Sequence, residues 1–204
     1  MKIGCYEVET RADDFRKGAI KNVYHRSVEG HGYQGEGAYS HKTHKLLYQT
    51  WRNMLMRVFS EDYHKKKPTY IGVEVCDEWL NLQVFGKWFE ENFIEDYVLD
   101  KDLLGNSTKI YSPDTCLFIS PRLNSFLTNK KSVNKSGYTG VYWHNRDKVW
   151  VASIHVDGKP RHLGYFDKIE EANETYKVAR LEQANLLKEL YKDKLPKEAL
   201  DAIH

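Results

Sequence analysis

Two aspartates one residue apart, Asp100 and Asp102, are side chains whose type and spacing suggest chemistry. They end the run 97–102, which we predict to be a short extended segment. Side chains two residues apart on a strand point to the same face, so the two carboxylates could share one ligand. Carboxylate oxygens suit a hard divalent cation. The alternative interpretation is that both are ordinary carboxylates at the entry to a loop.

A second set of polar side chains is spread over residues 142–162 and suits contact with nucleic acid. Three strands with two turns are predicted here, at 138–143, 149–156 and 161–166, with turns at 145–148 and 157–160. Alternation directs Trp150, Ala152 and Ile154 to one face, where they can pack on a helix. The outward set is Tyr142, Ser153, His155 and His162, flanked by His144, Arg146, Lys148, Lys159 and Arg161. Hydroxyls and imidazoles can meet base edges, and the cations suit phosphates.

The elements that must position the two aspartates begin with two amphipathic helices. Apolar residues recur at helical spacing over 43–60 and again from Asp77 to about Asn92, with Asp77 as the expected N-cap. The aromatic stripe of the second helix is predicted to be packed core. A short strand is expected at 70–75, and the glycine-rich stretch 30–37 is expected to be a loop.

A strand, a second strand and a short helix are predicted around the aspartates. The run 97–102 is followed by a strand at 115–119 and by a helix from Pro121 to about Leu127. Ser120 is the expected N-cap, with proline at the first helical position. Farther along, a helix begins at Ile169 and can continue past Leu187.

Four runs in the C-terminal part carry a resemblance to a known family. They are SGYTGVYW from Ser136, VWVASIH from Val149, HLGYFD from His162 and EEANETY from Glu170. Residues 135–182 thereby resemble the APETALA-type (ethylene-response-factor) DNA-binding domain. The resemblance implies a three-stranded antiparallel sheet packed on one helix, with its open face in the DNA major groove. Plant domains carry several arginines on that face, where this sequence has histidine, tyrosine and serine, so their target sequence does not transfer.

The central segment 40–127 resembles phage proteins of the HNH endonuclease type. The resemblance lies in Trp51, MLMR from Met54, YIGVEVCDEW from Tyr70, LDKD from Leu99, YSPDTCLF from Tyr111, and Asn124. It implies a ββα-metal unit in which one Mg²⁺ or Mn²⁺ ion assists phosphodiester cleavage. The implied catalytic set is Asp100, Lys101, Asp102 and Asn124, with Asp100 and Asn124 as the metal ligands.

Two positions depart from the HNH pattern. Lys101 stands where the histidine base is expected, and Thr115 stands at the usual structural asparagine. A lysine with an ordinary pKa near ~10.4 is protonated and cannot accept a proton. Asp102 or a metal-bound hydroxide would then have to replace the histidine base, and the Lys101 ammonium could instead offset charge at the scissile phosphate.

Charge is unevenly distributed along the 204 residues, although the net charge is only +2. Residues 40–67 carry seven Lys and Arg against two acids, 74–102 carry nine acids against two lysines, and 120–136 carry four cations and no acid. This pattern is compatible with a polyanionic partner. From the last block, Arg122, Lys130 and Lys131 are predicted DNA contacts. No apolar run approaches the ~20 residues of a membrane span, and three scattered cysteines argue against a disulfide framework.

These patterns predict an α+β fold, with a helical, ββα-metal-like central domain followed by a three-stranded antiparallel sheet packed on one helix. The expected division is an N-terminal arm (1–39), the HNH-like domain (40–127), a linker (128–134) and the APETALA-type domain with a C-terminal helical extension (135–204). After the linker, residues 135–204 are expected to fold alone.

The leading hypothesis is a phage or mobile-element protein that binds double-stranded DNA and nicks or cleaves it with Mg²⁺ or Mn²⁺. One alternative is a cleavage-dead regulator or repressor of transcription. A second is an interaction module that binds a host or competitor protein through the acidic centre. Asp100, Asp102 and Asn124 favour the enzyme, whereas Lys101 and Thr115 favour the regulator. The expected location is the cytoplasm of an infected cell, away from membranes, and a homo-oligomer is left open.

Overall fold

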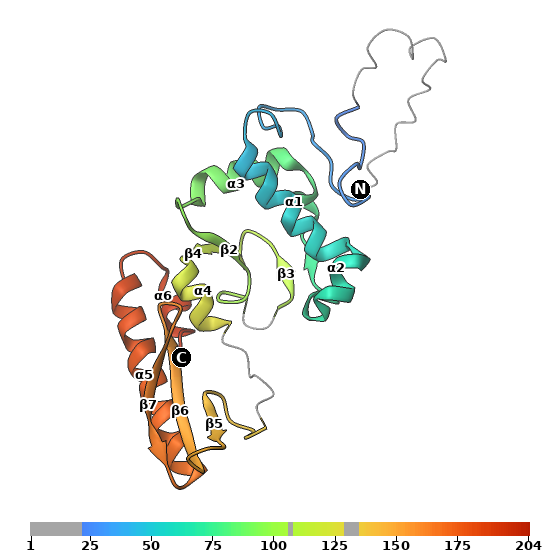
Figure 1. The fold of residues 1–204 in the computed structure, drawn as a ribbon. Coiled ribbons are helices and arrows are strands. Elements are labelled where there is room, and N and C mark those ends of the chain that lie inside the picture. Colours follow the sequence, from blue (N-terminus) through green and yellow to red (C-terminus); the bar gives the residue numbers. More distant parts are fainter. Residues whose placement is uncertain (1–21, 106–107, 129–134) are drawn as a thin grey trace, which may run out of the picture.

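The computed structural model describes residues 22–105, 108–128 and 135–204, which form helices and three small sheets (Figure 1). The α-helices are α1 (Lys45–Phe59), α2 (Glu61–Lys66), α3 (Leu82–Asn92), α4 (Pro121–Leu127), α5 (Ile169–Tyr191) and α6 (Lys197–Asp201). The strands are β1 (Glu74–Val75), β2 (Val98–Asp100), β3 (Ile110–Tyr111), β4 (Leu117–Ile119), β5 (Val141–His144), β6 (Val149–Val156) and β7 (Lys159–Phe166). The predicted α+β class is confirmed. Among the described residues, no helix combines the length and apolar character that a membrane crossing requires.

The first hydrophobic core lies between α1 and α3, as the helical spacing predicts. Trp51 of α1 is fully buried, and its Nε1 donates a hydrogen bond of 2.7 Å to the carbonyl oxygen of Trp79. The predicted aromatic stripe packs here, with Phe85 fully buried. The predicted cap was wrong: Asn81, not Asp77, caps α3 by accepting from the Gln83 amide at 2.9 Å. Residues Asp77–Leu80 form a separate 3-10 helix because the chain turns before α3 begins.

The described part of the predicted N-terminal arm, residues 22–39, lies against this core. The Tyr33 amide donates to the Leu80 carbonyl oxygen at 2.9 Å, and the Leu82 amide donates to the Tyr33 carbonyl oxygen at 3.0 Å. Gly32 approaches Trp51 so closely that an added Cβ would lie 2.9 Å from its ring. This part of the chain is therefore joined to α3 by main-chain bonds and to α1 by close packing.

The two predicted strands and the helix form around the two aspartates, with one further short strand, β3, between the two strands in the sequence. Strand β2 pairs antiparallel with β4, and α4 follows β4 directly. Ser120 caps α4, since its Oγ accepts from the Leu123 amide at 3.1 Å. Strand β2 ends at Asp100, so Asp102 lies in the turn that follows and not on the strand.

The sheet β5–β6–β7 is antiparallel in that order and packs one face on α5. Val141, Ala152 and Ile154 are buried against Ala172 and Tyr176 of α5. These are the inward positions that strand alternation predicts. The bulky Trp150 is partly buried on the same side, with its ring centroid 5.1 Å from that of Trp143.

Helix α5 is long enough to contribute to two hydrophobic clusters. Its first half covers the sheet, and its second half buries Ala184, Leu187 and Tyr191 against Leu123 and Phe126 of α4. The Tyr191 hydroxyl also bonds to Ser120 Oγ. The C-terminal extension thus packs on the unit formed by β2, β4 and α4, which we call the ββα unit. The four-part division of the chain stays a prediction.

Candidate nucleic-acid interface and ββα centre

The face of the sheet turned away from α5 collects the polar side chains that alternation predicts. Tyr142 lies opposite Val151 in the register, and Ser153 lies opposite His162. Directly opposed residues of an antiparallel pair share a face. His155 extends the same row of β6 toward the hairpin tip. The structure therefore brings Tyr142, Ser153, His155 and His162 onto one surface, which we call the outward face.

Tyr165 also lies on the outward face and was missed by sequence reasoning. It lies opposite Val151, and its ring centroid is 4.5 Å from that of His162. Simple alternation would direct residues three apart to opposite faces, but a bulge between Ala152 and Ser153 shifts the register. Gly164, at φ +152°, is the sequence signal that could have revealed the bulge, because glycine inside a strand often marks one.

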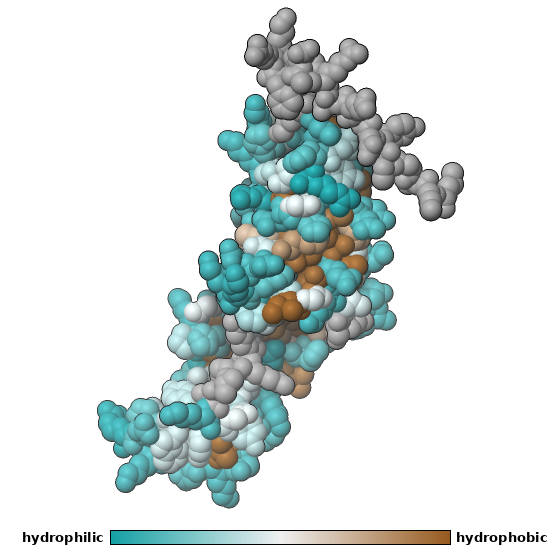
Figure 2. All heavy atoms as spheres, turned by 90° about the vertical axis from the view of Figure 1, so that its right-hand side faces the viewer, coloured by the Kyte–Doolittle hydropathy of each residue, from teal (hydrophilic) through white to brown (hydrophobic). Residues whose placement is uncertain are grey.

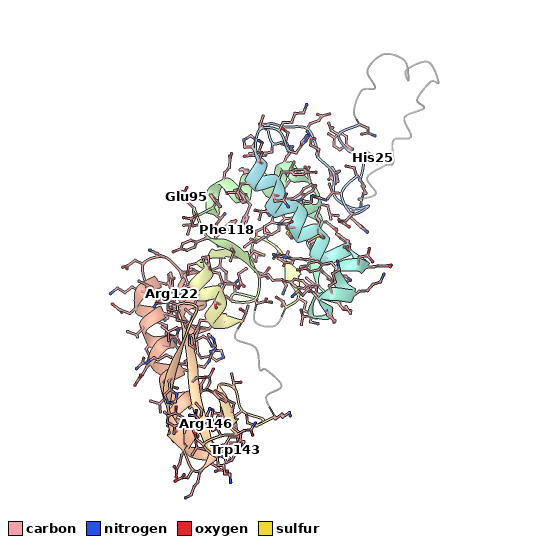
Figure 3. All side chains as sticks on the ribbon, in the orientation of Figure 1. His25, Glu95, Phe118, Arg122, Trp143 and Arg146 are labelled. Carbon is pink, nitrogen blue, oxygen red and sulfur yellow. The ribbon has the colours of Figure 1, made fainter. Side chains whose placement is uncertain are left out.

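The β5–β6 turn carries the cations nearest to one end of the outward face. Arg146 Nε donates to Asp147 Oδ1 at 2.8 Å, and His144 Nδ1 lies 3.1 Å from Asp147 Oδ2. The Arg146 hydrogen bond holds the pKa of the exposed Asp147 carboxyl below its ordinary value. Lys148 is exposed in the same turn, at φ +52°. The turn thus presents a lysine beside an ion-paired arginine, at the far end of the sheet from Arg122 (Figure 3).

The other predicted cations do not lie on the outward face. Arg161 lies opposite Ile154 and Lys159 opposite Val156, so the register places both on the side of the sheet that packs on α5. Both side chains are exposed there. Lys130 and Lys131 lie outside the described residues.

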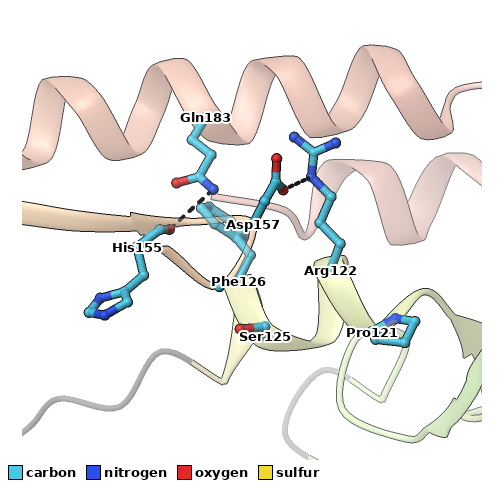
Figure 4. A pocket seen from close by; sticks show the side chains of 8 residues that line it. Pro121, Arg122, Ser125, Phe126, His155, Asp157 and Gln183 are labelled. Atoms are coloured by element: carbon cyan, nitrogen blue, oxygen red, sulfur yellow. Dashed lines mark hydrogen bonds and ion pairs between the residues drawn. The ribbon is translucent and has the colours of Figure 1, made fainter. Parts of the chain in front are cut away.

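Arg122 takes part in the junction between α4 and the β6–β7 hairpin. Its Nε lies 2.5 Å from Asp157 Oδ1, at the tip of the hairpin. A cavity of about 370 Å³ opens beside this pair, and His155 and Gln183 also line it (Figure 4). Gln183 Nε2 donates to the His155 carbonyl oxygen at 3.4 Å, while the His155 imidazole points to the other side of the strand (Figure 4). Arg122 thus holds two elements together in addition to being a candidate phosphate contact.

Asp100 is buried, and its carboxylate closes the turn after β2. Its Oδ2 accepts from the amides of Asp102 at 3.0 Å and Leu103 at 2.8 Å. Burial raises the pKa of the Asp100 carboxyl above its ordinary value, although the Leu103 hydrogen bond opposes the rise. These contacts are those of a side chain that stabilises a turn.

Lys101 and Asp102 pair with each other beside Asp100. The Lys101 side chain is only 8 % exposed, its Nζ bonds to Asp102 Oδ1, and it lies 5.7 Å from the centroid of the Tyr111 ring. The Asp102 side chain is 75 % exposed. The expectation that the two aspartates share a face was wrong, because Asp100 is buried at the end of β2 whereas Asp102 lies exposed in the turn that follows.

The remaining positions of the HNH pattern differ in their surroundings. Thr115 ties the loop before β4, since its Oγ1 donates to the Ile110 carbonyl oxygen at 2.7 Å and accepts from the Ser112 amide at 3.1 Å. Asn124 lies on α4, where its main-chain N–H donates to the Ser120 carbonyl oxygen. Among residues 22–105, 108–128 and 135–204, no three His, Cys, Asp or Glu side chains form a group that could hold a metal ion. The two expected ligands, Asp100 and Asn124, lie on β2 and α4, and the Asp100 carboxylate accepts two main-chain hydrogen bonds, so the Mg²⁺ or Mn²⁺ site stays a prediction.

No family model matches this chain, and no similar curated protein or solved structure was found. The two family resemblances therefore rest only on the residues that carry them.

Proposed function

We propose that this protein binds double-stranded DNA through the outward face of the β5–β7 sheet and does not cleave it. The observation that carries the proposal is the gathering of Tyr142, Ser153, His155 and His162 on one exposed sheet face. Their hydroxyl and imidazole groups can donate to and accept from base edges. A three-stranded sheet on one helix is also the arrangement that the APETALA-type resemblance implies.

The distribution of charge supports the orientation of the sheet toward a polyanion. In the β5–β6 turn, at one end of the outward face, Arg146 pairs with Asp147 and Lys148 is exposed. Helix α5, on the other side, contains five acids against three cations. The exposed Lys148 can attract a phosphate at that end of the outward face, whereas the surplus of acids on the helix itself makes α5 less favourable for a phosphate backbone.

The hydropathy of the surface also supports a DNA contact at the end of the molecule that holds the β5–β7 sheet. Figure 2 shows apolar side chains gathered over the central part, whereas the end that holds the sheet is pale to hydrophilic. Interfaces with DNA are more polar and more positively charged than those between proteins. The sheet end is therefore the better candidate for a DNA contact.

The ββα unit is better suited to binding than to cleavage. A hydrolytic centre of this kind needs a metal-bound carboxylate and a group that can accept a proton from water. Asp100 instead closes a turn, and the Lys101 ammonium is held by Asp102 and lies over Tyr111. Of the hypotheses that the sequence offers, this geometry favours a DNA-binding regulator.

The binding proposal is tested by a charge substitution in the β5–β6 turn. We expect Lys148→Gln to weaken binding of a labelled DNA duplex, similarly for all sequences, because it removes a phosphate contact without removing base contacts. The matched control is Lys177→Gln, on the α5 side, where the lysine pairs with Glu174 at 2.5 Å. Fluorescence anisotropy measures both affinities. An equal loss for the two variants would contradict the assigned face.

The absence of cleavage is tested with supercoiled plasmid and either Mg²⁺ or Mn²⁺. We expect no nicking above the protein-free background, because among the described residues the Asp100 carboxylate is engaged in a turn and Lys101 pairs with Asp102. The control is Asp100→Asn, prepared in the same way. Metal-dependent nicking by the natural protein that disappears in this variant would establish the endonuclease hypothesis instead.

A further inference from the structure

We propose that the outward face holds unpaired bases, so that the preferred DNA is a duplex with a locally melted segment. The inference rests on the proposed function and adds the state of the DNA that the face selects. It arises from a row of aromatic side chains across the sheet, which follows from the bulge and was absent from the sequence-based expectations.

The aromatic row consists of Tyr142 and Tyr165, which lie on either side of Val151 across the three strands. Val151 is 1 % exposed, although it lies on the face opposite to α5. The tyrosines on either side of it are 43 % and 62 % exposed. His162 adds a third ring, 4.5 Å from Tyr165 by ring centroids. The outward face is thus a set of exposed rings around a covered valine.

Exposed rings on a sheet are suited to stacking with unpaired bases. A base in a duplex has both faces covered by its neighbours and offers only its edges. An unpaired base offers a π-face, which tyrosine and histidine can cover, and every base has such a face. Guanidinium groups, which form bidentate contacts with guanine edges, do not occur on the outward face itself among the described residues.

The charge around the rings fits a nucleic-acid strand and not an apolar partner. Lys148 and the ion-paired Arg146 lie at one end of the sheet. His155 lies at the other, beside the cavity under the hairpin tip (Figure 4). A backbone that follows the sheet would place phosphates near the cations while its bases lie over the tyrosines.

The experiment compares three labelled DNA probes of equal length: a fully paired duplex, the same duplex with a central bubble of unpaired thymines, and a single strand. Anisotropy titrations use the full chain. The natural protein is expected to bind the bubble about tenfold more tightly than the paired duplex, since stacking of one base on a ring contributes in this range. Equal affinities for the two would overturn the inference and leave the proposed function intact.

Two substitutions of Tyr165 separate stacking from hydrogen bonding. Tyr165→Ala is expected to remove most of the preference for the bubble, whereas Tyr165→Phe, which keeps the ring, is expected to retain it. Because Tyr165 is 62 % exposed, both variants should fold normally, which circular dichroism verifies. An equal loss in both variants would assign the hydroxyl to a base edge and overturn the inference. Failure of the natural protein to bind any probe would instead overturn the proposed function.

Discussion

Leu187→Ala is expected to lower the free energy of unfolding by about 2–5 kcal/mol, the range observed for fully buried leucines. Leu187 has no exposed surface and lies in the cluster that joins α5 to Leu123 and Phe126 of α4. Truncation leaves a cavity at the point where the C-terminal extension packs on the ββα unit. Urea denaturation followed by circular dichroism measures the change.

The neighbouring residue provides a matched control for this variant. Leu186 is 68 % exposed on the same helix, so Leu186→Ala makes the same chemical change without a cavity. We expect its effect to remain within about 0.5 kcal/mol, as for surface substitutions elsewhere. If the two variants were equally stable, the packing of α5 on α4 would be refuted, and the predicted linker would separate two independent domains.

The affinity for duplex DNA is expected to fall about 250- to 1,000-fold between 50 and 200 mM salt. This range corresponds to a slope of log K against log salt of about −4 to −5, as for about five neutralised phosphates. Candidate cations lie in the β5–β6 turn and in the basic segment 40–67. Anisotropy titrations at four salt concentrations give the slope.

Paired substitutions show which surface of the protein contacts the phosphates and so displaces counterions from the DNA. Arg146→Gln with Lys148→Gln should make the slope shallower by nearly two, since each lost phosphate contact contributes about one. Lys177→Gln with Lys192→Gln removes two cations that pair with acids on or next to α5, and should leave the slope unchanged. An affinity that does not depend on salt would contradict the DNA-binding proposal as a whole.

Local sequence patterns were sufficient for most of the elements. The helical spacing of Trp51 and Leu55, the cap at Ser120 and the alternation of Trp150, Ala152 and Ile154 predicted α1, α4 and the inward face of β6. These features depend on contacts within a few residues, where side-chain type and periodicity decide which surface is buried. The same alternation correctly assigned the four polar residues of the outward face.

The surroundings of Asp100 could not be predicted from the local sequence. The spacing of Asp100 and Asp102 is compatible with a shared face, but only the tertiary structure shows that β2 stops at Asp100. The main-chain amides of Asp102 and Leu103 both donate to the Asp100 carboxylate, and Lys101 is buried near Tyr111 of β3. A sequence alone does not show which backbone groups will need an acceptor after the chain has folded.

The sequence by itself determined the α+β class, the longer helices and the polar character of the outward face, because each follows from local periodicity and turn residues. Only the tertiary structure decided that Tyr165 joins this face, because a bulge in a strand pair depends on the register between strands. It also decided that the second half of α5 covers α4. That contact joins residues about sixty positions apart, and burial of their apolar surfaces is favourable only once both helices are in place.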